Sequence, residues 1–181
     1  MVTFDLERVK KFVIEKNNEE LLNADQLCVV AAGDMGCVVA LNWILSDWNW
    51  SASPKQGQDV KGAVLLSPAP TYKTLKTQPA FAHPFVAGKM STMLIGGKTE
   101  AGLKNLYNQF KAKHAPTPTD EEEAAKHQDL FYIPLDTELR GTDLLHPDLM
   151  MWDVIRHFLD LRFVNKAENF PWQERKSPIS K

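Results

Sequence analysis

The sequence has little that would mark it for an oxidising compartment, a membrane or a nucleic acid. It holds two cysteines in 181 residues, and its formal net charge is only −2. The longest apolar runs, such as 28–32 and 63–66, are far shorter than the ~20 residues that a membrane-spanning helix needs. We therefore expect neither a nucleic acid nor a membrane as partner.

Signals for export and for metal binding are also missing. No apolar segment follows Met1, so a cytoplasmic location is the default expectation, while a secreted origin stays open. The five histidines are scattered and no CxxC or HExxH occurs, so we predict no metal and no cofactor. Cys28 is expected in a strand and Cys37 on the next helix, which predicts two buried free thiols.

Four short apolar runs alternate with longer segments of helical period. This alternation is typical of an α/β fold with a parallel sheet of about four strands flanked by helices on both faces. We predict a single domain over residues 1–168 and a C-terminal tail over 169–181. The predicted strands are Leu27–Ala32, Val60–Ser67, Ser91–Gly96 and Leu130–Leu135.

Helical periodicity predicts where the helices lie. They are expected at about 5–22, 35–46, 100–113 and 147–164. In the first helix, Val9, Phe12 and Val13 form an apolar stripe that is expected to face the core.

The segment from Leu27 to Leu41 carries the most specific signal. An apolar strand ends, turns within about four residues and becomes a buried helix, with small residues at Ala32 and Gly36 on either side of Asp34. A nucleophile elbow needs this arrangement, because its central residue takes a strained backbone angle and strand and helix approach closely. Asp34 is thus the candidate for the central position.

In this turn and in the order of the elements after it, the chain resembles the α/β-hydrolase family. The resemblance implies a nucleophile, an acid and a histidine in that chain order, which match Asp34, Glu100 and His146. The backbone N–H of Met35 would then be an oxyanion donor. Haloalkane dehalogenases and epoxide hydrolases of this family carry Asp at the elbow, so the resemblance implies hydrolysis of an ester, epoxide or carbon–halogen bond in a small-molecule substrate.

The chain departs from that family in three respects. Met35 stands where those relatives usually have Trp, there is little room for a helical cap, and no strands precede the first helix. The fold expected is therefore α/β-hydrolase-like but lacking the N-terminal strands, so that the strand Leu27–Ala32 would present an apolar, unpaired edge. A missing N-terminal segment or a second chain in a homo-oligomer would cover this edge, or the domain would be marginally stable.

Two other interpretations stay open. Asp34 can be a helix-capping residue in a degenerate elbow, which leaves a non-enzymatic interaction domain on a hydrolase scaffold. Alternatively, residues 33–36 can open a phosphate- or nucleotide-binding βαβ module, although GxGxxG and GxxxxGK[ST] are both absent.

Overall fold

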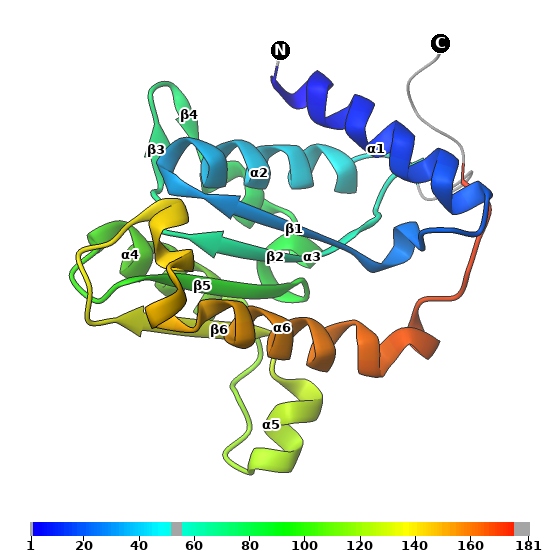
Figure 1. The fold of residues 1–181 in the computed structure, drawn as a ribbon. Coiled ribbons are helices and arrows are strands. Elements are labelled where there is room, and N and C mark those ends of the chain that lie inside the picture. Colours follow the sequence, from blue (N-terminus) through cyan, green and yellow to red (C-terminus); the bar gives the residue numbers. More distant parts are fainter. Residues whose placement is uncertain (1, 52–55, 176–181) are drawn as a thin grey trace.

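The chain forms a four-stranded parallel sheet with helices on both faces (Figure 1). The computed structural model describes residues 2–51 and 56–175, with side chains from residue 5 onward. In spatial order the strands are β1 (Leu27–Ala32), β2 (Val60–Leu66), β5 (Ser91–Gly97) and β6 (Leu130–Leu135). A separate small hairpin joins β3 (Thr71–Tyr72) to β4 (Leu75–Lys76). The predicted α/β class and parallel sheet are confirmed.

The helices lie in two layers around this sheet. On one face α2, α3 and α4 pack on the strands, and on the other face lies α6, while α5 projects away and buries no side chain (Figure 1). Short 3-10 segments join these elements. The α-helices are α1 (Val2–Asn18), α2 (Gly33–Trp48), α3 (Pro84–Gly88), α4 (Ala101–Lys111), α5 (Glu121–His127) and α6 (Met151–Arg162). The 3-10 segments are η1 (Ala24–Gln26), η2 (Gln78–Ala82), η3 (Gly141–Leu145), η4 (Pro147–Leu149) and η5 (Val164–Asn169).

The two faces of the sheet build two hydrophobic cores. Because side chains alternate along a strand, β2 sends Ala63 and Leu65 into the core beneath α2 and α4. It sends Val64 and Leu66 into the core beneath α6. A strand buried on both sides reads as a continuous apolar run, which is why the sequence located these strands well.

One edge of the sheet is formed by β1. Its partner in the sheet is β2, with Val29 opposite Ala63, and within the described residues no strand pairs with its other side. The predicted unpaired edge is therefore confirmed. Val30, in the middle of β1, is 53% exposed.

Two of the three residues in the apolar stripe expected to bury α1 face solvent, and the third, Val13, is partly buried. Val9 is 62% and Phe12 55% exposed, so the prediction for the buried face of this helix was wrong. The face of α1 that packs inward is mostly polar and consists of Glu7, Lys10, Ile14 and Asn17.

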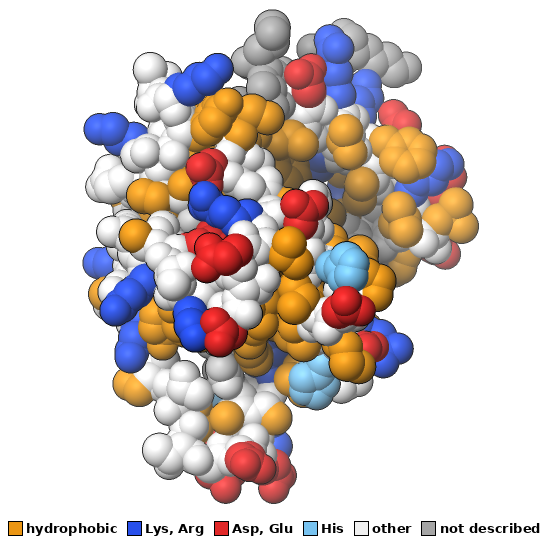
Figure 2. Space-filling model, turned by 60° about the vertical axis from the view of Figure 1, so that its left-hand side comes forward, with side chains coloured by type: hydrophobic (Ala, Val, Ile, Leu, Met, Phe, Trp, Pro, Cys, Tyr) orange, Lys and Arg blue, Asp and Glu red, His pale blue; other side chains and the backbone are white. Residues whose placement is uncertain are grey.

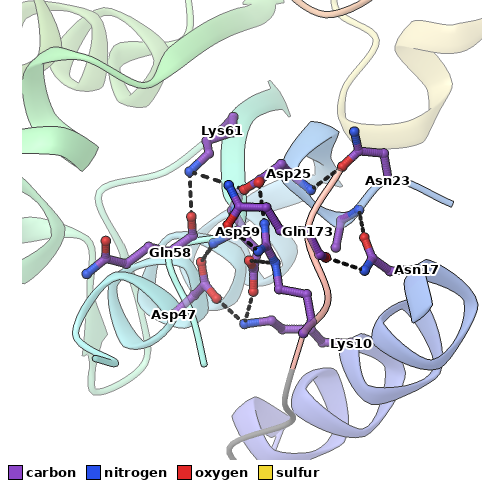
Figure 3. Close-up of polar contacts among 12 residues, drawn as sticks. Lys10, Asn17, Asn23, Asp25, Asp47, Gln58, Asp59, Lys61 and Gln173 are labelled. Carbon is purple, nitrogen blue, oxygen red and sulfur yellow. Dashed lines mark hydrogen bonds and ion pairs between the residues drawn. The ribbon is translucent and has the colours of Figure 1, made fainter. Parts of the chain in front are cut away.

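Buried ion pairs explain this inversion. The ammonium of Lys10 contacts Asp47 at the end of α2 and lies 2.8 Å from Asp59, which precedes β2 (Figure 3). Burial lowers the pKa of Lys10, but the two carboxylates outweigh this effect, and the net pKa is raised above its ordinary value. The other Asp47 oxygen accepts the backbone N–H groups of Asp59 and Val60 at 2.8 and 3.1 Å. These contacts fix α1 to the end of α2 and the start of β2.

The segment after η5 packs back onto α1. Asn17 donates a 2.8 Å hydrogen bond to the carbonyl of Gln173 (Figure 3), and the indole of Trp172 donates to the Asn17 carbonyl. Arg175 is buried and pairs with Asp25 and Asp59. The chain is therefore anchored at both ends of its described length to one polar cluster.

In the part of the chain that the structure describes, no helix is both long enough and apolar enough to cross a membrane.

Candidate functional site

A hollow of about 360 Å³ lies at the carboxyl edge of the sheet, where the strands end. Open parallel sheets usually place their sites at this edge, because the loops after the strands converge there. Figure 2 shows the molecule turned so that this side comes forward, with acidic and basic side chains interspersed over its centre. The residues that line the hollow are Ala32, Gly33, Asp34, Ser67, Arg140, Gly141 and Thr142.

The turn from β1 into α2 forms one wall of the hollow. The positive backbone angle expected at Asp34 lies one residue earlier, at Gly33, whose φ is +72°. Asp34 is instead the second residue of α2, in its first turn. The position with the strained angle therefore carries no side chain that could act as a nucleophile.

Gly36 does not have the steric role expected of it. A Cβ atom built at Gly36 would meet nothing within 4 Å, so strand and helix do not approach closely there. A second glycine with positive φ, Gly141 at +58°, lies directly beside Gly33. The backbone around the hollow is thus shaped by Gly33 and Gly141.

The carboxylates of Asp34 and Glu100 are brought together by an arginine. Arg140, in the loop after β6, places its guanidinium 3.5 Å from Asp34 Oδ1 and 3.3 Å from Glu100 Oε2. Asp34 and Arg140 are about half exposed, whereas the Glu100 side chain is buried. Arg140 therefore occupies the place between the carboxylates that the resemblance assigns to a histidine.

Glu100 also organises the backbone around the hollow. Its Oε1 accepts the backbone N–H of Gly97 at 2.7 Å and the hydroxyl of Ser67 at 3.0 Å. The Ser67 oxygen in turn accepts the N–H of Gly141 at 2.9 Å. Ser67 is buried and has a positive φ of 49°, which is costly for a residue with a Cβ. This chain of hydrogen bonds joins the ends of β2 and β5 to the loop after β6.

His146 lies apart from this group. Its ring is about half exposed, and Nδ1 lies 3.5 Å from an Asp148 oxygen and accepts the Asp148 N–H at 3.4 Å. It lines a different hollow together with Leu139 and Asp143. Among the described residues, no hydrogen bond or ion pair connects the ring to Asp34 or Glu100. The role of His146 as a base stays a prediction from the resemblance.

Met35 and Cys37 lie on the first turns of α2. The backbone N–H of Met35 belongs to the first turn, whose N–H groups have no acceptor within the helix, and its role as an oxyanion donor stays a prediction from the resemblance. The thiol of Cys37 is buried and lies 3.5 Å from the Leu66 carbonyl. Burial raises the pKa of this thiol to about 12, so it is protonated and a poor nucleophile at neutral pH.

Three residues of the site were not singled out from the sequence: Ser67, Arg140 and Gly141. Ser67 is the last residue of one predicted strand and Arg140 follows another. The carboxyl ends of parallel strands meet at one edge, so position alone could have drawn attention to both residues. In the described part of the chain no cluster of three or more His, Cys, Asp or Glu side chains could hold a metal ion. The charged side chains that the structure brings together here are Arg140 and the carboxylates of Asp34 and Glu100.

No family model, curated protein or solved structure matches this chain. Fold and site geometry are therefore the basis on which a function can be proposed.

Proposed function

We propose that this chain is an α/β-hydrolase-like domain that has lost hydrolase chemistry and works by association through its β1 edge. The observation that carries the proposal is the unpaired β1 edge together with exposed apolar side chains on β1 and on the two helices next to it in the chain. Val9 and Phe12 on α1, Val30 on β1 and Met35 on α2 are each more than half exposed. Apolar side chains clustered beside an unpaired strand are typical of a protein–protein interface.

An apolar groove continues this surface. About 350 Å³ in volume, it runs between β1 and α2 and is bounded by Leu6 of α1. Val29, Val30, Met35, Val39 and Trp43 line it. A strand that paired with β1 would satisfy the backbone groups of this edge and place its side chains over the groove.

The occupant that fits this surface is a second copy of the chain. Asp5, Val9, Phe12 and Lys16 follow the i, i+4, i+7, i+11 spacing and form one outer stripe on α1. If two such helices pack antiparallel about the point between Val9 and Phe12, each Val9 meets the Phe12 of the second copy. Each Asp5 then meets the Lys16 of the second copy, so the stripe is self-complementary in both shape and charge.

Two helices packed antiparallel in this way are related by a twofold axis, and a twofold axis can also relate two copies of the sheet. An axis normal to the sheet relates two β1 strands as antiparallel neighbours and keeps both α1 helices on the same face. The proposed dimer joins two four-stranded sheets into one of eight strands, and it requires the two α1 stripes to meet above the junction.

The oligomeric state measured by sedimentation over a range of concentrations tests the proposal. We expect a dimer that Val9→Lys dissociates. Val164→Lys is the matched control, because Val164 in η5 is equally exposed at 62% and lies outside the surface. A chain that stays monomeric at every concentration, or a dimer that Val9→Lys leaves intact, would overturn the proposal.

A charge exchange tests the geometry of the contact. Asp5→Lys alone and Lys16→Asp alone each place like charges opposite one another and should weaken the dimer. Mixing the two variants places Lys opposite Asp at both ends, so a heterodimer should form from them. If the mixture associates no better than either variant alone, the antiparallel α1 contact is wrong.

Hydrolysis at the carboxyl edge is the second candidate function, favoured by the half-exposed Asp34 carboxylate on the 360 Å³ hollow. A panel of activated esters, epoxides and haloalkanes tests it. Turnover that disappears in Asp34→Asn would establish Asp34 chemistry and overturn the loss of catalysis. Equal background rates for the two proteins would support an interaction domain.

A further inference from the structure

A second, more basic hollow lies at the opposite edge of the sheet, where the strands begin. Its volume is about 430 Å³. Lys61 at the start of β2, Ser91 at the start of β5 and Asp129 before β6 form its floor. Phe85 and Lys89 from the region of α3 line another part of it. The rest comes from Asp25, from Arg162 and Lys166 near the end of α6, and from the segment 169–173.

Positive charge exceeds negative charge in this hollow. Four cationic side chains line it: Lys61, Lys89, Arg162 and Lys166. The two acidic side chains are already engaged. Asp25 pairs with Arg175 and lies 3.9 Å from Lys61, and Asp129 accepts a 2.7 Å hydrogen bond from Ser91 and lies 3.6 Å from Arg162. Asp25, Lys61 and Gln173 lie close together in Figure 3.

Arg162 is the most deeply placed of these cations. Its side chain is buried, and its Nη atoms donate to the carbonyls of Ala125, Lys126 and Gln128 at the end of α5. Its Nε–H has no hydrogen-bond partner within the described residues. Because the Arg162 side chain is closed to solvent, it acts on the hollow through its positive charge.

Lys166 stands beside Arg162 on the same wall. Its ammonium donates to the Lys126 carbonyl at 2.6 Å. Desolvation, followed by the repulsion from Arg162, lowers the pKa of Lys166. An anion in the hollow would offset this repulsion and accept a hydrogen bond from the Lys166 ammonium.

We propose that this hollow binds a phosphate group carried by a small molecule. Phosphate presents several acceptor oxygens and more than one negative charge, which suits a site lined by three lysines and an arginine that approach from different elements. Phe85, which stacks on Trp48 at a ring-centroid distance of 3.6 Å, and Phe170 give the hollow apolar walls for the rest of the molecule. The site is independent of the β1 edge and of Asp34.

Isothermal titration with inorganic pyrophosphate, and with sodium chloride at matched ionic strength as the control, tests the site. We expect saturable binding of pyrophosphate that the chloride control does not show. Lys89→Met and Lys166→Met should each weaken it by about two- to fivefold, the size of one lost ion pair. Lys104→Met, an exposed lysine on α4 outside the hollow, is the matched control and should bind like the parent chain.

Thermal unfolding without ligand accompanies each variant, so that a loss of folding is separated from a loss of binding. Lys89 is exposed, and its substitution leaves the packing of α3 in place. The absence of saturable pyrophosphate binding would overturn the proposal. Binding that Lys89→Met and Lys166→Met leave unchanged would overturn it equally.

Discussion

The guanidinium of Arg140 lies 3.5 Å from the carboxylate of Asp34, although 105 residues separate the two along the chain. Arg140 lines the carboxyl-edge hollow and places a positive charge beside the residue that the resemblance assigned as a nucleophile. Arg140 reaches Asp34 because β1 and the loop after β6 both end at the same edge of the sheet. The Arg140–Asp34 pair lies at the surface, whereas the Glu100 carboxylate, which Arg140 also contacts, is buried.

Substitutions of Arg140 and of Glu100 should differ in their effect on the free energy of unfolding. Arg140→Ala removes a half-exposed pair and should lower the free energy of unfolding by less than about 1 kcal/mol. Glu100→Ala leaves the Gly97 N–H and the Ser67 hydroxyl without their acceptor and should cost about 1–3 kcal/mol. Urea unfolding measures both. Equal losses would mean that Glu100 does not organise the loops.

Glycine positions in the turn between β1 and α2 provide a second test. Gly33→Ala forces a Cβ into a positive φ and should cost about 1–2 kcal/mol. Gly36→Ala places a methyl group into open space within α2 and should stabilise the protein by about 0.5–1 kcal/mol. The order would reverse if a tight strand–helix approach at Gly36 shaped the turn, as the sequence pattern suggested. Thermal unfolding of the two variants measures the difference.

The buried lysine of α1 should be essential for stability. Lys10→Met leaves the Asp47 and Asp59 carboxylates buried without their shared cation, which should cost about 3–5 kcal/mol. Lys104→Met, at an exposed site on α4, is the control and should change stability by less than about 0.5 kcal/mol. Guanidinium unfolding compares the two variants. A small loss in Lys10→Met would mean that water reaches the cluster.

Glu7 should give the stability of the protein a defined dependence on pH. Burial raises the pKa of Glu7, opposed by Lys10 and by a 2.7 Å hydrogen bond from the Trp43 indole, while Asp47 and Asp59 raise it further. A carboxyl group with a raised pKa in the folded state binds more protons there than when unfolded. The contribution of Glu7 to the free energy of unfolding therefore falls as pH rises from the ordinary pKa of glutamate through the raised pKa of Glu7, and then levels off.

Glu7→Gln keeps an acceptor for the indole and removes this titration. The stability of the variant relative to the parent chain should increase as pH rises through that window and stay constant above it. Urea midpoints of both proteins, measured from pH 4 to pH 8, test this. A difference that stays flat across the range would contradict the raised pKa.

The sequence located the strands because their signal is local. The predicted ranges 27–32 and 130–135 are those of β1 and β6, since strands buried on both faces read as short apolar runs between turns. The edge position of β1 followed from the resemblance and not from the local pattern, because the strand that would neighbour it in the family's sheet order is absent from the described part of this chain. Reasoning from the local pattern failed for α1, whose apolar stripe of Val9 and Phe12 is exposed.

What the sequence determined by itself is the class of fold, the order of its elements and the turn at Gly33, because each depends on residues that are neighbours in the chain. The tertiary structure alone decided which side chains meet. Lys10 turns the polar face of α1 inward because Asp47 and Asp59 converge on it from two other elements. Arg140, and not His146, reaches Asp34 because the loop after β6 folds over the ends of the strands. Such contacts depend on the path of the whole chain, and no local pattern encodes them.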